Sequence, residues 1–354
     1  MLTPGDLLLV GLGKMGQGIA ELLIDRMAQE ALDEGKFSRV LTCVDPIQAQ
    51  LVATRHRLEK RGRSFAEKMI VPLRKKFHNG TSNQEVVESF VSNLLDHCLF
   101  ERGLEACKEA LFVFEAAAED LKIKTDLFTK LSKQLPKEAL FFTNTSAIPI
   151  KELEKPIVGR LAGLHFYNPP PVQPIIEVVV PANAHPKLSL TISELLAGWK
   201  KEEVLSPDIP GFIGNGFMIP EIEMALSMLS NHSVEELNQM TREKLGRPLG
   251  IFELVDFVGR DIVIAIGKVM GKDLSGVSRL PPPHKLAHHK KIGEAEVVEK
   301  INQDNDPLLQ DYLKGLNTIA SNLIEKGVLR ENLEKVLKQG FHHSFVPWDK
   351  RLKR

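Results

Sequence analysis

A histidine and a glutamate lie near the middle of the chain, on two short apolar stretches joined by a proline-rich segment. His165 follows the apolar run 160–164, and Glu177 lies within the run 175–180, with Asn168 between them. A buried charge is costly unless it is paired, so two ionisable side chains on core-like strands are unusual. A single buried histidine is most often a hydrogen-bonded structural residue. The rest of the sequence therefore decides whether His165 does chemistry.

Composition narrows the classes of function. The chain has 354 residues, and its 46 basic and 46 acidic side chains give a formal net charge of zero. Because neither sign of charge is in excess, we expect neither nucleic acid nor a membrane surface as a partner. The hydrophobic content of 43% is typical of a globular protein. The length favours two or three domains.

The cysteines and the N-terminus bear on the compartment. Cys43, Cys98 and Cys107 are odd in number and lack the spacing of metal ligands, which indicates buried thiols in a reducing environment. The first apolar run is short and has no basic residues before it, unlike a signal peptide or a membrane span. These features predict a cytoplasmic protein.

Four histidines late in the chain occur as two adjacent pairs, His288 with His289 and His342 with His343. Two histidines that bind one metal from a helix are instead spaced by four residues, which places them on one face. We therefore expect no metal site.

A glycine-rich turn follows the first apolar run, residues 7–10, which predicts a parallel strand buried on both faces. The turn has the spacing GxGxxG and leads into a stretch with helical periodicity, the context that a dinucleotide-binding turn requires. Its glycines allow a tight turn and let a pyrophosphate approach the helix N-terminus, where free N–H groups favour anions. The expected contact residues are Gly11, Gly13, Lys14, Met15 and Gly16.

Asp45 follows a second predicted strand, residues 40–44. An acidic side chain there accepts hydrogen bonds from the ribose hydroxyls and repels a 2′-phosphate, which favours NAD over NADP. The acid usually follows about 20 residues after the glycines, whereas here it lies further along the chain. We attribute the difference to a lengthened helix and loop between residues 25 and 38.

Four more strands are predicted at 111–114, 139–143, 160–164 and 175–180, whereas residues 84–110 are expected to be helical. Ligands of an open α/β sheet bind at the carboxyl ends of its strands. The polar residues expected at or just beyond these ends are Asp45, Glu119, Lys124, Asn144, Thr145, Ser146 and His165. The pattern predicts a Rossmann-type, doubly wound and mostly parallel sheet.

The proline-rich segment 205–212 indicates a domain boundary, so we expect an NAD-binding domain at 1–206 and an all-helical domain at 207–354. Asn215 lies at the start of a long apolar helix in the second domain. The spacing of similar residues suggests a duplicated helical unit, covering 221–260 and 312–348, although chance matches between helix pairs are a competing explanation.

Taken together, these stretches resemble the L-3-hydroxyacyl-CoA dehydrogenase family. The matching pieces are VGLGKMGQGIA, CVDP, FEAAAEDLKIKTDLF, TNTSAI, GLHFYNPPPVQPIIEVV, PGFIGN and GRPLGIFELVDFVG, which lie between about residues 8 and 259. Each piece alone is unspecific, but the combination is very specific.

The resemblance implies a reaction and a role for each residue. An L-3-hydroxyacyl-CoA would be oxidised reversibly to the 3-oxoacyl-CoA with NAD, in fatty-acid β-oxidation or related acyl-CoA metabolism. His165 would be the general base, oriented by Glu177. The residues implied to contact the reacting oxygen or the substrate are Ser146, Asn168 and Asn215, and Glu119, Lys124 and Asn144 would lie near the cofactor.

Some positions depart from the family pattern. Ala147 stands where a second serine is usual, and Gly216 where arginine is common. Lys75 matches the segment that clamps CoA, but an obvious serine partner is absent there. If the helical repeat is genuine, its second copy would cover a face that other members bury by dimerising. The chain is therefore expected to be a monomer with the repeat and a homodimer without it.

Two other functions stay open. The weak CoA clamp is compatible with an NAD-dependent dehydrogenase of a hydroxy acid or sugar acid that carries no CoA. A non-catalytic, NAD-binding structural protein is the third interpretation, and the complete catalytic set argues against it.

Overall fold

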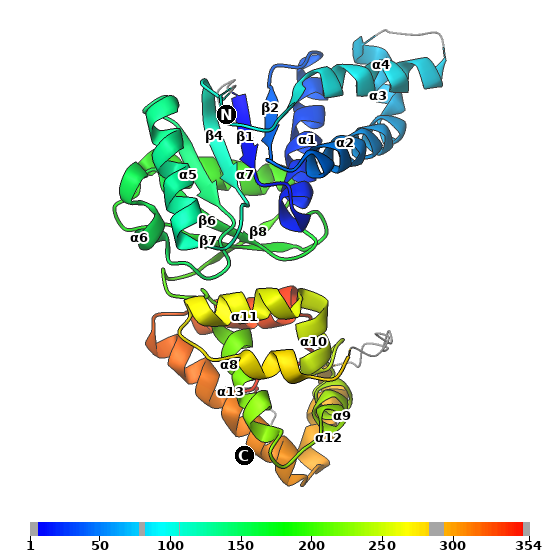
Figure 1. The fold of residues 1–354 in the computed structure, drawn as a ribbon. Helices are drawn as coiled ribbons and strands as arrows, with labels where there is room; N and C mark the ends of the chain where they lie inside the picture. Colours follow the sequence, from blue (N-terminus) through cyan, green and yellow to red (C-terminus); the bar gives the residue numbers. More distant parts are fainter. Residues whose placement is uncertain (1–5, 78–81, 106, 283–293, 350–354) are drawn as a thin grey trace. The chain divides into compact units, whose positions relative to one another are not determined.

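The computed structural model describes residues 6–77, 82–105, 107–282 and 294–349. His288 and His289 lie outside these ranges. The chain forms two compact units (Figure 1). Unit 1 comprises residues 1–145 and 150–203, and unit 2 comprises residues 146–149 and 204–354. The division between residues 203 and 204 thus falls slightly before the boundary expected at 206. In addition, residues 146–149, which the sequence analysis placed in the first domain, belong to unit 2.

Unit 1 is built on an eight-stranded sheet in the order β3-β2-β1-β4-β5-β6-β7-β8. Strands β1 to β6 pair in parallel along this order, and β7 pairs antiparallel with β6. The strand bounds are β1 Asp6–Val10, β2 Leu41–Val44, β3 Cys98–Glu101, β4 Ala110–Glu115, β5 Leu140–Thr143, β6 Leu161–Phe166, β7 Ile175–Val179 and β8 Glu202–Leu205. The predicted doubly wound, mostly parallel sheet is confirmed.

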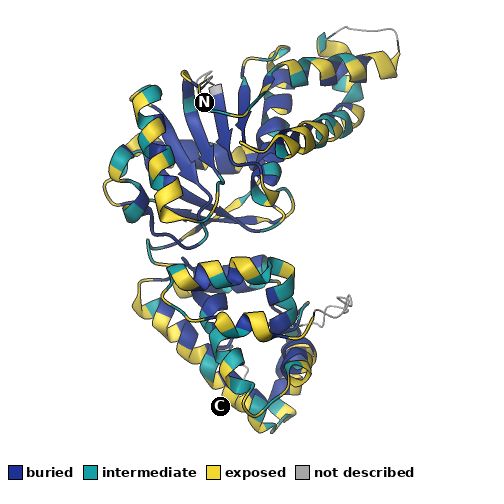
Figure 2. Ribbon diagram, in the orientation of Figure 1, coloured by how far each residue is buried: buried dark blue, intermediate teal, exposed yellow. Residues whose placement is uncertain are grey.

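The central strands are buried on both faces, as their continuous apolar sequences predict (Figure 2). The helices of unit 1 are α1 Lys14–Glu34, α2 Gln48–Lys68, α3 Ile70–Phe77, α4 Asn83–Asp96, α5 Leu121–Gln134, α6 Ile150–Leu153, the 3₁₀ turn η1 Lys155–Ile157 and α7 Pro186–Trp199. Helix α1 ends at Gly35, whose φ of 75° is left-handed. The extra residues before Asp45 therefore form a long α1 and the loop after it.

The sheet has two strands that the sequence analysis did not predict. Residues 98–101 form β3 instead of continuing a helix, and β8 was not predicted. Both lie at the ends of the strand order and are partly exposed, so neither has the fully buried apolar run of the equally short β2 and β5. His165 lies at the end of β6, as predicted, and antiparallel pairing with β7 extends the strand by one residue to Phe166. The three cysteines are buried free thiols, as predicted, and burial raises the pKa of Cys98 to about 12.

Unit 2 is helical in its described part, apart from the end of β8. Its elements are α8 Gly214–Met228, α9 Val234–Gln239, η2 Met240–Lys244, α10 Ile251–Val258, α11 Arg260–Val269, η3 Ser275–Arg279, α12 Glu294–Gln303, α13 Pro307–Glu325, α14 Arg330–Lys335 and η4 Val336–Gly340. In the ranges that the structure describes, no helix is both long and apolar enough to cross a membrane.

Two short π-helices, η2 and η4, lie at corresponding positions of the two sequence segments suspected of being a repeat. Each follows a six-residue helix, and each is closed by a backbone hydrogen bond to its first residue, from Leu245 to Met240 and from Phe341 to Val336. A left-handed residue follows each, Gly246 with φ 63° and His342 with φ 57°. The same local structure therefore occurs twice in unit 2.

Candidate active site

The β6–β7 hairpin places His165 directly opposite Glu177. Their side chains meet, with His165 Nδ1 at 2.9 Å from Glu177 Oε1. Glu177 is fully buried, and 6% of His165 is exposed. A cross-strand pair of this kind follows from the strand register alone, because opposite residues of an antiparallel pair point to the same face.

Tyr167, which the sequence analysis did not single out, adds a third member to this pair. Its hydroxyl donates to the same Glu177 Oε1 at 2.7 Å, and its ring centroid lies 5.4 Å from that of His165. Burial, and then the charge of Glu177, raises the pKa of Tyr167 well above its usual value, so the phenol stays protonated and donates. Tyr167 lies two residues beyond His165 and directly after β6, so continuing the period-two alternation past the predicted strand end would have pointed to it.

The contact between His165 and Glu177 selects the tautomer of the imidazole. A carboxylate accepts only, so Nδ1 carries the proton and donates it to Glu177. Nε2 is then the ring nitrogen with a lone pair, which can take a proton from a substrate hydroxyl. The buried carboxylate would stabilise the imidazolium formed in this way.

The glycines of the turn after β1 have different roles. A Cβ on Gly11 would lie 2.5 Å from the Ala116 backbone, and one on Gly16 would lie 1.9 Å from the Gly11 carbonyl oxygen. Gly11 also has a φ of 91°. Both are therefore required by close packing. Gly13 differs, since nothing lies within 4 Å of its Cβ position.

The open space beside Gly13 lies at the N-terminus of α1, where Gly13 is the N-cap and Lys14 and Met15 are the first helical residues. A pyrophosphate can approach the backbone N–H groups of this helix end there, because the Gly13 position carries no side chain. The residues present thus fit the phosphate portion of a dinucleotide.

Asp45 lies directly after β2 and is 7% exposed. Its two carboxylate oxygens accept from separate backbone amides, Oδ2 from Leu12 at 2.8 Å and Oδ1 from Ile47 at 2.9 Å. The carboxylate therefore ties the glycine turn to the loop after β2. Each carboxylate oxygen has two lone pairs, so acceptor capacity is left for ribose hydroxyls.

A buried charge cluster lies at the ends of β4 and β5. Lys124 is 1% exposed, and its Nζ donates to Glu115 Oε1 at 2.6 Å and lies 3.6 Å from Glu119 Oε2. Glu115, which the sequence analysis missed, is fully buried and also accepts from Ala117 N and from Thr143 Oγ1. The acidic residue was hidden at the end of an apolar strand.

Asn144 and Thr145 bridge neighbouring elements of unit 1. Asn144 Oδ1 accepts from the backbone N–H of Phe166 at 3.0 Å, next to His165, and Thr145 Oγ1 donates to Glu119 at 2.7 Å. The structure thus links the strand ends of β4, β5 and β6 through side chains, as the sheet topology predicts.

Ser146 and Asn215 lie together in unit 2, although they are far apart in sequence. Asn215, near the start of α8, donates from Nδ2 to the backbone oxygen of Ser146 at 2.7 Å. The sequence analysis assigned Ser146 to the strand end of the first domain. The structure instead groups residues 146–149 with unit 2, where Gly211 N donates to the Ala147 oxygen.

Asn168 and Lys75, the two remaining predicted substrate contacts, lie in a loop and on a helix surface. Asn168 precedes Pro169 through a cis peptide bond, and its carbonyl accepts from Gln173 Nε2 at 3.2 Å. Lys75 is exposed on α3, which packs against α1, α2 and α4 within unit 1. The structure does not bring Lys75 to the strand ends that carry His165.

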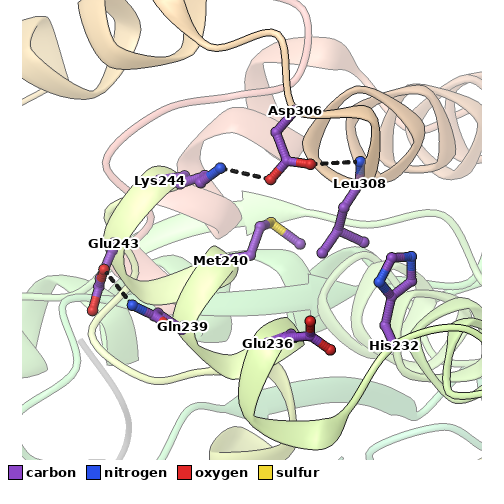
Figure 3. A pocket seen from close by; sticks show the side chains of 8 residues that line it. All are labelled: His232, Glu236, Gln239, Met240, Glu243, Lys244, Asp306 and Leu308. Carbon is purple, nitrogen blue, oxygen red and sulfur yellow. Dashed lines mark hydrogen bonds and ion pairs between the residues drawn. The ribbon is translucent and has the colours of Figure 1, made fainter.

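A separate hollow of about 340 Å³ lies in unit 2 beside η2 (Figure 3). Four of its lining side chains pair with one another, since Lys244 Nζ donates to Asp306 Oδ2 at 2.6 Å and Gln239 Nε2 donates to Glu243 Oε2 at 3.0 Å. In the described part of the chain, no three His, Cys, Asp or Glu residues are grouped to hold a metal ion. We assign no ligand to this hollow.

Comparison with known families identifies the sheet-bearing unit. Residues 7–209 match the family model "3-hydroxyacyl-CoA dehydrogenase, NAD binding domain", and residues 211–300 match the model of the C-terminal domain. The chain belongs to the 3-hydroxyacyl-CoA dehydrogenase family. Its cofactor is therefore NAD, and it is an oxidoreductase, as the sequence motifs predicted. The second suspected repeat, 312–348, lies beyond both matched ranges.

Similar curated proteins carry related names. The chain is 28% identical over 294 residues to a probable 3-hydroxybutyryl-CoA dehydrogenase of Bacillus subtilis, covering 81% of this chain and 92% of the relative. It is also 28% identical to the human mitochondrial hydroxyacyl-coenzyme A dehydrogenase, covering 71% and 75% of the two chains. These similarities fit the family assignment.

Solved structures show the same fold over nearly the whole chain. The crystal structure of 3-hydroxybutyryl-CoA dehydrogenase from Escherichia coli K12 superimposes with a TM-score of 0.70 at 19% identity, covering 98% of this chain and 91% of that chain. At this identity the likeness concerns the fold alone.

Proposed function

We propose that the chain oxidises an L-3-hydroxyacyl-CoA to the 3-oxoacyl-CoA, with His165 as the general base. The observation that carries the proposal is the buried His165–Glu177 contact at 2.9 Å on an NAD-binding sheet. In a family of NAD-linked dehydrogenases, a carboxylate-paired histidine at the carboxyl end of a strand of that sheet has the chemistry that alcohol oxidation needs. The setting is fatty-acid β-oxidation or related acyl-CoA metabolism in the cytoplasm.

The residues of the glycine turn and Asp45 would hold the cofactor, which accepts a hydride from the substrate carbon when it is bound. His165 Nε2 takes the proton of the substrate hydroxyl, so that the alcohol loses one proton and one hydride in total. Glu177 holds the ring in the tautomer that makes Nε2 the acceptor and stabilises the positive charge that results. In the reverse direction His165 returns the proton to the oxygen.

We further propose that Ser146 and Asn215 donate to the reacting oxygen, as the family resemblance implies. Asn215 donates one hydrogen of its side-chain amide to the Ser146 backbone oxygen. The amide group carries two hydrogens, and we propose that the second is donated to the substrate. Asn168 and Lys75 are proposed substrate contacts, and Glu119, Lys124 and Asn144 are proposed to shape the cofactor site.

The repeated local structure around η2 and η4 supports a duplicated helical unit at 221–260 and 312–348. Helices α8 and α13, one from each copy, pack against each other within unit 2. We propose that this packing weakens the need to dimerise. Sedimentation should then show a monomer at low micromolar concentration, and an obligate dimer would contradict this.

The test of the proposed function is a substrate comparison. NADH consumption should be followed with acetoacetyl-CoA and with free acetoacetate in parallel, and repeated with NADPH. We expect turnover of the thioester with NADH and little with NADPH, because Asp45 repels a 2′-phosphate. Turnover of the free acid but not of the thioester would instead support a hydroxy-acid dehydrogenase, a reading that the exposed Lys75 without a serine partner keeps open.

A further inference from the structure

The chain has two tyrosines, and both are buried with their hydroxyls donated to a glutamate. Tyr312 donates to Glu221 Oε1 at 2.8 Å within unit 2. Tyr167 donates to Glu177 Oε1 at 2.7 Å, on the carboxylate that also holds His165. One tyrosine therefore lies within the proposed catalytic hairpin and the other does not.

The position of the Tyr167 hydroxyl matters because it shares an acceptor atom with the imidazole. Tyr167 and His165 both approach Oε1, so the two donors fix the carboxylate from two directions. The tilted ring contact between Tyr167 and His165, with centroids 5.4 Å apart, restrains the imidazole further. The two donors limit the rotation of the Glu177 carboxylate, and the ring contact limits the rotation of the His165 imidazole.

We propose that Tyr167 is a positioning residue that holds Glu177 against His165 and shifts the proton uptake of the base to lower pH. The inference rests on the proposed function and deepens it. Within unit 1, Glu177 from β7 and Tyr167, directly after β6, are two titratable groups that contact the His165 side chain. On the other side, β5 is followed by the uncharged Asn144, which bonds to the β6 backbone.

The direction of the effect follows from charge sharing. A hydroxyl that donates to a carboxylate disperses part of its negative charge, which weakens the attraction of that carboxylate for an imidazolium. Without the hydroxyl, Glu177 would stabilise protonated His165 more strongly. The alcohol-oxidising form, in which His165 is neutral, would then appear only at higher pH.

The experiment measures kcat/KM for oxidation of 3-hydroxybutyryl-CoA against pH in Tyr167→Phe and in Tyr312→Phe. Phenylalanine keeps both rings and removes only the hydroxyl. We expect the midpoint of the acid limb to move up by about 0.5–1 pH unit in Tyr167→Phe, which corresponds to the net free energy of a typical hydrogen bond. The limb of Tyr312→Phe should stay in place. An unmoved limb in an active Tyr167→Phe, with a uniform loss or no loss of rate, would overturn the proposal.

Two further measurements test whether Tyr167 acts through Glu177. In a Glu177→Gln background, adding Tyr167→Phe should no longer shift the limb, because the shared carboxylate is gone. An equal shift in both backgrounds would contradict the proposal.

Tyrosinate absorbance in Tyr312→Phe reports Tyr167 alone, and this readout does not need an active enzyme. Tyr167 should ionise well above pH 10 and at a lower pH once Glu177→Gln is added. Ionisation near 10 in the parent would show that the hydrogen bond is absent and overturn the proposal, even if Tyr167→Phe failed to fold. An inactive parent enzyme would count against the proposed function, whereas an active one with an unmoved limb would count against Tyr167 only.

Discussion

Two histidines of this chain, His165 in unit 1 and His343 in unit 2, are equally buried, each with 6% of the residue exposed. His165 contacts the Glu177 carboxylate. His343 lies near the Arg247 guanidinium, and burial first, then the charge of Arg247, lowers its pKa well below the usual value. Burial alone therefore does not determine what a histidine can do. At His343 the positive charge of Arg247 adds to the effect of burial, whereas the charged neighbour of His165 is a carboxylate.

The carboxylates of the two regions differ in the same way. Glu177 and Glu221 each accept a tyrosine hydroxyl. The other partner of Glu177 is an imidazole, which can gain or lose a proton. The other partner of Glu221 is Arg247, which is always charged. A fixed link between helices is thus formed by Glu221 on α8, Arg247 after η2 and Tyr312 on α13. In the β6–β7 hairpin, by contrast, the partner of the glutamate is an imidazole, which can gain or lose a proton.

The largest expected effect beyond His165 itself is that of Glu177→Gln. Gln keeps the size of the side chain but removes the charge that orients and stabilises the imidazolium. We expect kcat to fall by about 10²–10⁴ with the NADH affinity retained, as measured by initial rates and by fluorescence titration. A fall in kcat of less than threefold would contradict the difference drawn between Glu177 and Glu221, because Glu177 would then be no more than a structural partner of His165.

Arg247→Met is the matched change in unit 2. It leaves the Glu221 carboxylate buried without its cation, which typically costs about 3–5 kcal/mol of unfolding free energy. Urea unfolding of the two proteins measures this loss. The rate per folded molecule should be close to that of the parent. A stability loss below about 1 kcal/mol would show that the link is not a structural centre.

A Cβ at Gly13 should affect the ligand more than the fold. Gly13→Ala meets no atom within 4 Å, so we expect a stability change below about 1 kcal/mol, the size of an N-cap effect. The NADH affinity should fall by roughly tenfold, about the 1.4 kcal/mol that a lost close approach to phosphate can account for. Gly246→Ala in unit 2 is the control, since its Cβ would lie 2.5 Å from Val297 Cγ2 and should lower stability but not the NADH affinity. The reverse pattern would contradict the account of the turn.

The smallest effect concerns the dependence of stability on pH. In the folded chain His343 resists protonation, whereas in the unfolded chain it takes up a proton near pH 6.5. Stability should therefore fall as the pH drops below about 6.5, by at most about 1.4 kcal/mol per pH unit from this group. His343→Gln should flatten the acid side of the curve measured by urea unfolding between pH 7.5 and 5. An unchanged slope would show that His343 is accessible to protons in the folded state.

The sequence predicted the parts of the site that follow from strands and turns. His165 and Asp45 could be located because parallel strands bring their carboxyl ends to one edge, and Glu177 because it lies within the next apolar run, which pairs antiparallel with that of His165. Asp45 and the glycines are positioned by short-range geometry, which local sequence encodes.

The features that were missed depend on tertiary packing. Glu115 is hidden in an apolar strand, and its role appears only when Lys124 is buried against it from α5. The placement of Ser146 in unit 2 follows from its contact with Asn215, a residue distant in sequence. The strands β3 and β8 were missed because they lie at the two ends of the strand order and are only partly buried, so they lack the continuous apolar run that marked β2 and β5.

The most direct test of the central claim is the rate of His165→Ala with 3-hydroxybutyryl-CoA and NAD. NADH formation is followed by absorbance, and NADH binding is measured separately. Removing a general base should lower the rate by about 10²–10⁴, while NADH binding stays as in the parent, because the glycine turn and Asp45 are untouched. Turnover close to that of the parent would contradict the account, since His165 would then be one more buried histidine, as His343 is.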